Sequence, residues 1–253
     1  MMTELMLVEG VSDVQLISYF LQNVYGWKHE NNNQLGITPL DEHEHIESLS
    51  QGENQLVLCG VGGNGKFTYF VEQHRVNDMI VEREITSLMV VTDRDEETDA
   101  KIQRTINNSL EKITIKVGQW INNSIVDSFG QPKTIDTYLL IIPANEKGAL
   151  ERVIINALKD ITEESQIIQE VIGFVNYLKD NFLEELKQTN KENKATVGTF
   201  FSVRYPKNAM RSFGRFISKI DWSKSDSLKE LFEPFEYIGK EKPRTPSVTS
   251  RVL

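Results

Sequence analysis

The amino-acid sequence predicts an α/β fold in which a mainly parallel central sheet is flanked by helices and followed by a helical C-terminal part. One observation behind this prediction is that short apolar runs alternate with segments of helical periodicity, which favours parallel strands joined by right-handed crossovers. A second is that the first and third apolar runs end in carboxylates, at Glu9 and Asp93. Ligands bind such sheets at the carboxyl ends of the strands. We therefore expect both carboxylates at one functional edge of the sheet.

The first half of the chain begins with a predicted buried strand over residues 5–8. A helix capped by Ser12 follows, because the next apolar residues recur at helical spacing. Residues 28–53 are polar, and the asparagine run at 31–33 indicates a loop. The other elements expected in this half are, in order, a strand over 56–59, a glycine-rich turn over 60–66, a helix to about Val76, a strand over 88–91 and a helix to about Lys112.

The second half is predicted to add a β-hairpin and then only helices. Residues 113–142 contain an alternating run, a Gly-Gln-Pro turn at 130–132 and a final apolar run, which is typical of a hairpin, and we place the inserted hairpin at about 113–135. The elements expected after it are, in order, a helix from near Lys147, a long helix over 163–187, a loop over 188–195, a basic helix over 207–219, a short helix over 228–232 and a disordered tail over 240–253.

Composition narrows the class of protein. The chain has 253 residues, of which 39% are hydrophobic and 26% charged, which is typical of a globular protein with a sizeable core. No apolar run approaches the roughly 20 residues of a membrane span, and the first residues lack the layout of a signal peptide, so no membrane partner is expected. The single cysteine, Cys59, rules out an internal disulfide and favours a cytoplasmic location.

The net charge of −9 is unfavourable for binding phosphate over the whole surface. Much of the acid, however, lies in two clusters, at residues 41–47 and 93–99. Carboxylates that bind a divalent cation count as negative in this sum, although the bound cation reverses their local field. A nucleic-acid partner is therefore compatible with the sequence only if a local cationic surface exists.

Four carboxylates are expected to meet at the sheet edge. Glu9 and Asp13 begin a strand-to-helix turn, and Asp93 and Asp95 directly follow the third strand. Either pair alone is more often a helix cap or a solvated turn. Together they would repel one another unless a cation binds, and oxygen ligands are those that Mg²⁺ prefers. With one or two Mg²⁺ or Mn²⁺ ions such a set forms a clamp for phosphodiester chemistry.

The segments Val8–Asp13 and Thr92–Asp95 resemble the two motifs of Toprim domains, and the aspartate four residues after the glutamate resembles the OLD-like (overcoming lysogenization defect) nuclease branch in particular. Leu58–Lys66 is similar to the glycine-containing turn after the second Toprim strand. Ile142-Pro143 and the following segment 148–151 are similar to a later element of single-domain OLD-like proteins. No ATPase region is present in the sequence.

The resemblance implies a Toprim-like Rossmannoid fold and a metal-dependent nuclease that hydrolyses DNA or RNA, tRNA included. It implies a catalytic domain over residues 1–160 with a helical region over 161–239 packed on it. The implied metal ligands are Glu9, Asp13, Asp93, Asp95 and Glu151. The implied catalytic residues are Glu9, Asp93, Asp95 and Lys207, the lysine contacting the phosphate. Some Toprim effectors of anti-phage defence work with a separate ATPase, which makes such a protein a candidate partner; self-association is left open.

Two alternative functions compete with this interpretation. Gly60-x4-Gly65-Lys66 nearly matches a Walker A loop, so a P-loop-like nucleotide-binding protein is one alternative, but Phe67 stands where Ser or Thr would bind Mg²⁺. A non-catalytic Toprim module held by an ATPase partner is the other. His43 and His45 lie in an acidic segment that we interpret as an exposed loop rather than a zinc site. Cys59 is interpreted as a buried small hydrophobe.

A late basic segment is the predicted nucleic-acid-binding surface. Its cations recur every four residues within the predicted helix over 207–219, so they would form one stripe along it. They are Lys207, Arg211, Arg215 and Lys219, with Arg204 just before them. The competing interpretation is an ordinary amphipathic helix with a solvated cationic face.

Overall fold

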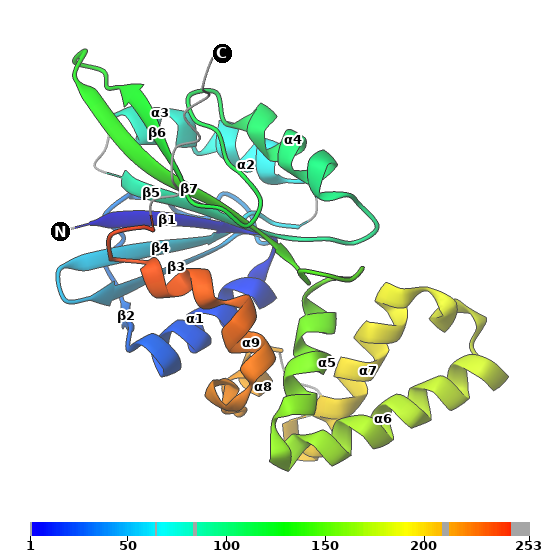
Figure 1. Ribbon diagram of the computed structural model, residues 1–253. Coiled ribbons are helices and arrows are strands. Elements are labelled where there is room, and N and C mark those ends of the chain that lie inside the picture. Colours follow the sequence, from blue (N-terminus) through cyan, green and yellow to red (C-terminus); the bar gives the residue numbers. More distant parts are fainter. Residues whose placement is uncertain (1, 64, 83–84, 209–212, 244–253) are drawn as a thin grey trace, which may run out of the picture.

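The computed structural model describes residues 2–63, 65–82, 85–208 and 213–243, and a seven-stranded mixed sheet lies at its centre (Figure 1). The strand order is β2-β3-β4-β1-β5-β7-β6. Four central strands are parallel: β4 (Asn54–Gly60), β1 (Thr3–Val8), β5 (Ile85–Asp93) and β7 (Pro132–Ile142). The edge strands β2 (Lys28–Glu30), β3 (His45–Gln51) and β6 (Ile121–Val126) pair antiparallel. The predicted α/β class is confirmed.

Helices cover both faces of this sheet, which explains why its central strands are apolar on both sides. On one face lie α1 (Val11–Tyr25), α5 (Leu150–Asp160) and α9 (Asp226–Leu231), and on the other lie α2 (Phe67–Gln73), α3 (Val76–Glu82) and α4 (Asp99–Ser109) (Figure 1). Strand residues alternate between the two cores: Met6 and Val8 pack in the first, Leu5 and Leu7 in the second. Each core holds one of the helical layers in place.

The C-terminal part is helical, as predicted. The helices α6 (Thr162–Asn181) and α7 (Thr189–Arg204), joined by the short helix η1 (Glu184–Lys187), project from the sheet beside α5 (Figure 1). The chain then returns to the face that α1 covers. It does so through η2 (Pro206–Asn208), α8 (Gly214–Ile217), η3 (Trp222–Lys224), α9 and η4 (Glu233–Tyr237). No helix in the described ranges is long and apolar enough to cross a membrane.

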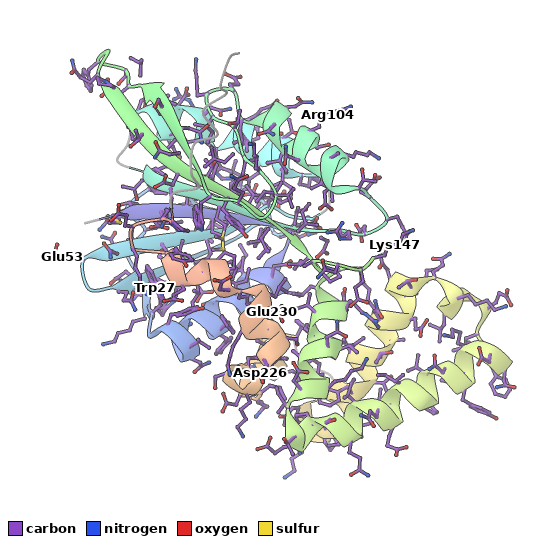
Figure 2. All side chains as sticks on the ribbon, viewed as in Figure 1. Trp27, Glu53, Arg104, Lys147, Asp226 and Glu230 are labelled. Carbon is purple, nitrogen blue, oxygen red and sulfur yellow. The ribbon has the colours of Figure 1, made fainter. Side chains whose placement is uncertain are left out.

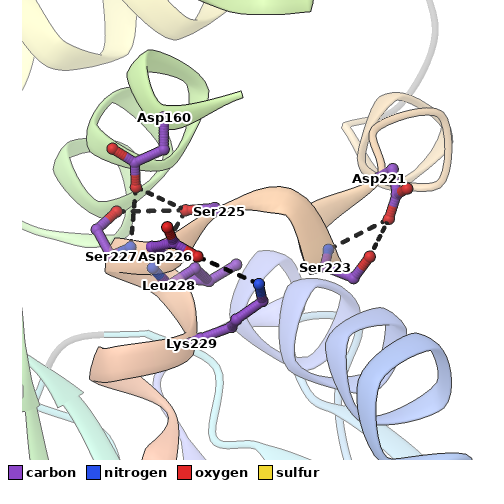
Figure 3. Close-up of polar contacts among 8 residues, drawn as sticks. All are labelled: Asp160, Asp221, Ser223, Ser225, Asp226, Ser227, Leu228 and Lys229. Atoms are coloured by element: carbon purple, nitrogen blue, oxygen red, sulfur yellow. Dashed lines mark hydrogen bonds and ion pairs between the residues drawn. The ribbon is translucent and has the colours of Figure 1, made fainter. Parts of the chain in front are cut away.

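Hydrogen bonds of Asp160 join this returning segment to α5 (Figure 3). The Asp160 carboxylate at the end of α5 accepts from the Ser225 hydroxyl at 3.1 Å and from the Ser227 backbone N–H at 2.8 Å. Burial alone would raise the pKa of Asp160, but these hydrogen bonds lower it. Ser225 also caps α9, because its Oγ accepts from the Leu228 N–H. The start of α9 is thus fixed to the sheet layer.

The end of the described chain is fixed to the first strand. The Lys242 ammonium lies 2.7 Å from a carboxylate oxygen of Glu4 and 4.9 Å from the centre of the Trp120 ring. Glu4 also accepts hydrogen bonds from Ser87 and from the Gly239 N–H. Disorder was expected from residue 240, but Lys242 is buried; residues 244–253 lie outside the described ranges.

Several element boundaries differ from the sequence-based expectation. The polar segment 28–53 contains β2 and β3, which lie at one edge of the sheet where polar side chains can reach solvent. Within the hairpin predicted at about 113–135, the alternating run 113–117 makes only isolated bridges. The hairpin instead spans 121–142 as β6 and β7, and β7 is a central parallel strand rather than part of an insertion. The helix expected to end near Val76 ends at Gln73, and a second helix, α3, which was not predicted, begins at Val76; Arg75 between them has a left-handed φ of 52°.

The C-terminal expectations differ more. The predicted loop at 188–195 is the first half of α7. This polar half buries Asn193 and continues into a buried apolar face in the second half, formed by Val197, Phe200 and Phe201. The predicted continuous basic helix over 207–219 is wrong, because only Pro206–Asn208 and Gly214–Ile217 are helical within its described part. Proline fixes one backbone angle and glycine adds backbone freedom, so both weaken a continuous helix there.

Candidate active site

Glu9 and Asp93 meet at the carboxyl edge of the parallel strands. Val8 pairs with Val91, so the residues that follow these strands are neighbours. One oxygen of the Glu9 carboxylate accepts hydrogen bonds from the Thr92 hydroxyl at 2.8 Å and from the Asp93 backbone N–H at 3.1 Å. Glu9 is almost fully buried. The sequence-based expectation that the two strand ends share one edge is met.

Asp13 joins this edge from the first turn of α1. Its carboxylate accepts from the Gly10 N–H at 3.0 Å, which closes the turn between β1 and the helix, and its side chain is buried. The glycine-rich segment packs against the same turn, since the Gly63 N–H donates to the Glu9 carbonyl at 2.8 Å. Gly60 is needed for this approach, because a Cβ there would lie 3.2 Å from the Gly10 backbone.

Asp95 and Glu151 reach the edge through the segment that starts α5. Asp93 accepts from the Leu150 N–H at 3.0 Å and so orients the first turn of α5, in which Glu151 is the next residue. Asp95 has a left-handed φ of 48° and pairs with Gly148 through two backbone hydrogen bonds, of 2.7 and 3.2 Å. This backbone conformation is rare for a residue other than glycine and is often found at functional sites.

The pKa shifts indicate electrostatic repulsion among these five carboxyl groups. Burial raises the pKa of Asp93 to about 10, and Asp13, Glu9, Glu151 and Asp95 all act in the same direction. Burial, with Glu9 and Glu151, raises the pKa of Asp13 to about 7. Burial also raises the pKa of Glu9, against the hydrogen bonds from Thr92 and Asp93. Among the described residues, no basic side chain offsets these effects at Glu9, Asp13 or Asp93, so this buried part of the cluster favours a proton or a cation.

The start of α7 contributes residues that the sequence analysis missed. The Asn190 amide donates to Asp95 at 2.9 Å, and the Lys194 ammonium lies 3.9 Å from the Glu151 carboxylate. Asn193 is buried beside Gly148, and its Nδ2 has no hydrogen-bond partner in the part of the chain that the structure describes. The three residues lie at positions i, i+3 and i+4 of one helix. That spacing was present in the sequence, but it is visible only once 188–195 is recognised as helical.

The donor chemistry of this cluster fits a hard divalent cation, because every carboxyl group supplies oxygen. Among the described residues, however, no group of three or more His, Cys, Asp or Glu side chains is arranged to hold a metal ion. Each of four carboxylates instead has a partner in the protein: Glu9 has Thr92, Asp13 has Gly10, Asp93 has Leu150 and Asp95 has Asn190. Binding an ion requires some of these hydrogen bonds to be exchanged for metal contacts.

The predicted cationic residues lie elsewhere. Lys207 follows the far end of α7, about 20 Å along that helix from Asn190, so the structure does not bring it to the carboxylates. Arg204 makes a bidentate ion pair with Glu164, at 2.8 and 3.1 Å. Lys219 lies over the Tyr205 ring, and Arg215 lines a separate cavity. Arg211 lies outside the described residues. The predicted single stripe is thus replaced by dispersed cations.

The other singled-out motifs have structural roles. Lys66 lies over the Tyr69 ring at 5.3 Å, and Phe67 is buried in the second core, so the Walker-like loop leads into a packed helix. The acidic segment at 41–47 is not wholly exposed, since Glu44 is buried and lies 2.9 Å from His74. Cys59 is fully buried, as predicted, and burial raises the pKa of its thiol.

The fold and the site together define an α/β protein with a carboxylate cluster at the carboxyl edge of its parallel strands. The chain belongs to the family described as protein of unknown function DUF3226, whose model matches residues 3–235. No curated protein matches it. A crystal structure of hypothetical protein PH0156 from Pyrococcus horikoshii OT3 is similar to this chain, with a TM-score of 0.44 and 15% identity over 92% of this chain and 99% of that one.

Proposed function

We propose that this protein is a divalent-metal-dependent nuclease that hydrolyses phosphodiester bonds of DNA or RNA. The observation that carries the proposal is the gathering of five carboxyl groups, from three separate segments, at the one sheet edge where α/β proteins bind ligands. Maintaining buried carboxylates without a counter-charge costs stability, and such clusters are characteristic of functional sites. The resemblance of the sequence to Toprim motifs supports the same chemistry.

In this proposal Glu9, Asp13, Asp93, Asp95 and Glu151 hold one or two Mg²⁺ or Mn²⁺ ions. Bound ions supply an activated water and neutralise charge on the phosphate. The chain itself supplies the remaining functions. Glu9, deep in the cluster with a raised pKa, serves as the proton acceptor. Lys194, which lies beside Glu151, takes the role of phosphate contact that the sequence analysis gave to Lys207.

The direct test incubates the purified protein with plasmid DNA and with total tRNA, in Mg²⁺, in Mn²⁺ and in EDTA. Cleavage of at least one substrate with metal, and none in EDTA, is expected. Glu9→Gln and Asp93→Asn should abolish it. The matched control is Asp226→Asn, whose side chain is 93% exposed on α9, away from the loop of Lys147 that adjoins Asp95 (Figure 2). This control should cleave normally.

Failure to cleave either substrate in either metal would overturn the proposal for the isolated chain. Metal binding without cleavage would favour the alternative of a silent Toprim module held by a partner. The proposal includes a cytoplasmic location and, through the Toprim resemblance alone, an ATPase partner in an anti-phage system. Repeating the assay with such an ATPase tests that part.

A further inference from the structure

A cavity of about 530 Å³ lies on the face of the sheet that α1 covers, apart from the carboxylate cluster. Its walls come from α1, β3 and the α8 segment, and β2 adds His29. Gln15, Tyr19 and Gln22 recur at i, i+4 and i+7 of α1 and so share one helix face. His45 and Glu47 are two residues apart on β3 and point to the same side of the sheet. The volume is within the range of small-ligand sites.

The third wall is α8 with the residue that follows it, and these supply Arg215 and Ser218. Gly214 allows α8 to approach α1, because a Cβ at this position would overlap the Gln15 side-chain amide. The cavity therefore combines one permanently cationic group, Arg215, with an aromatic ring, Tyr19, and two amides. These are the side-chain types that contact a phosphate, stack on a base and hydrogen-bond to a base edge.

Glu47 lines this cavity, and one of its carboxylate oxygens can accept hydrogen bonds from a ligand. Its Oε1 accepts from the Ser18 hydroxyl at 2.6 Å, and Ser18 is buried and in turn accepts from Gln22 at 2.9 Å. His29 is only 3.4 Å from the same oxygen, and its side chain is 57% exposed, so this contact is weak. The other oxygen, Oε2, has no hydrogen-bond partner within the described chain.

The cavity adjoins the carboxylate edge. His45 pairs with Gly60 on β4, and Gly60 pairs with Val8 and packs against Gly10, next to Glu9. Two strand spacings, about 10 Å, therefore separate β3 from β1 at this edge. A nucleic-acid strand with one phosphate at the carboxylates can place a neighbouring nucleotide in the cavity.

We propose that this cavity binds a guanine nucleotide of the nucleic-acid substrate, an inference that rests on the proposed function. Guanine is the base whose Watson–Crick edge carries two adjacent donors, N1–H and the exocyclic amino group, which match an acceptor-only carboxylate. The corresponding edge of uracil places carbonyl oxygens beside its single donor, and Glu47 repels these. In the complex Glu47 accepts from the base, Tyr19 contacts its ring and Arg215 meets a phosphate.

The test measures binding of the four nucleoside monophosphates to the full chain in EDTA, by NMR titration, so that no cleavage is required. GMP should bind at least tenfold more tightly than UMP. Glu47→Gln keeps an oxygen for Ser18 but adds a donor, and should remove this preference. Arg215→Ala should weaken the binding of GMP but not the binding of guanosine, which has no phosphate. The matched control is Glu72→Gln, an exposed glutamate on α2 on the opposite face of the sheet, which should leave both affinities unchanged.

Equal affinity for GMP and UMP, or a preference that survives Glu47→Gln in a folded variant, would overturn the inference. The two proposals can fail separately. A protein that cleaves nucleic acid but does not prefer GMP keeps its proposed function and loses this nucleotide site. A protein that prefers GMP through Glu47 but cleaves nothing retains the site as a nucleotide-binding cavity outside nuclease activity.

Discussion

Asp93 and Asp13 are the residues at which burial and like charge act most strongly together. A raised folded-state pKa means that the neutral form is favoured in the folded protein. The stability that this neutral form contributes is complete below the ordinary pKa of 3.8 and is lost as pH rises through the folded values, about 7 for Asp13 and about 10 for Asp93. At neutral pH, therefore, the metal-free protein carries a destabilising cluster.

Replacing one of these carboxyl groups by a group that does not titrate should stabilise the metal-free protein. Asp93→Asn keeps an oxygen for the Leu150 N–H but no longer titrates. We expect it to raise the free energy of unfolding by about 1–3 kcal/mol at pH 8 and to have little effect at pH 4. Urea denaturation in EDTA across this pH range measures the difference. A variant less stable than wild type at pH 8 would contradict the assigned electrostatics.

A divalent cation should stabilise the wild type more at pH 8 than at pH 6, because the metal displaces protons from Asp13 and Asp93. At a metal concentration 100 times the dissociation constant, stabilisation of about 2.7 kcal/mol is expected. Thermal melting with Mg²⁺ or Mn²⁺ measures it. Glu9→Gln should lose most of the shift, whereas the exposed-residue control Asp226→Asn should retain it.

At the scale of elements, α7 joins the helical part to the active edge. Its first turns supply Asn190 and Lys194, while Lys207 lies beyond its other end. The sequence predicts the carboxylate edge well, because apolar strands and the residues that end them are local features. It does not predict α7, because the helix is polar and depends on tertiary burial of Asn193 and Phe200. The prediction of a continuous basic helix is wrong for a related reason: the four-residue spacing of the cations says nothing about the helix-weakening effect of Pro206 and Gly214.

The position of α7 predicts which lysine affects cleavage. Lys194→Ala should lower the cleavage rate at least tenfold, because a cation next to the cluster is lost, while metal-induced stabilisation stays. Lys207→Ala and the exposed Lys191→Ala should change the rate less than twofold. Rates under saturating metal decide this. Equal losses for Lys194 and Lys207 would place the phosphate contact elsewhere.

The attachment of α9 predicts a stability effect without an active-site effect. Asp160→Ala leaves the Ser227 N–H and the Ser225 hydroxyl without their acceptor and should lower the free energy of unfolding by about 1–3 kcal/mol. Asp221→Ala removes only the cap of the short helix η3 and should lower the free energy of unfolding by less. Urea denaturation of both variants gives the ranking, and a reversed order would contradict the role given to Asp160.

At the scale of the whole molecule, a net charge of −9 means that nucleic acid must approach a local cationic surface. Arg204 is neutralised by Glu164, whereas the described segment 213–219 carries Arg215, which lines the proposed nucleotide cavity, and Lys219. Each phosphate contact contributes to the dependence of affinity on salt. The salt dependence therefore reports how many of these cations are used.

Reversing Arg215 and Lys219 to glutamate should weaken tRNA binding in EDTA and flatten the plot of log affinity against log salt by about one to two units. Fluorescence anisotropy at several salt concentrations measures the slope, and circular dichroism confirms the fold. Reversing Lys101 and Arg104 on α4, on the opposite face of the sheet, is the control and should leave the slope unchanged. An unaltered slope in the Arg215 and Lys219 variant would show that nucleic-acid phosphates bind to another part of the surface.

The contact between Glu4 and the segment 239–242 also has a consequence for synthesis on the ribosome. Glu4 lies in a central strand that is translated first, yet two of its partners, Gly239 and Lys242, are translated more than 230 residues later. A nascent chain that stops before them has Ser87 but no cation for a carboxylate buried in the sheet, and loss of a buried ionic partner costs about 3–5 kcal/mol. The amino end of β1, at the opposite edge of the sheet from the carboxylates, therefore reaches its full stability only after residue 242 has been translated.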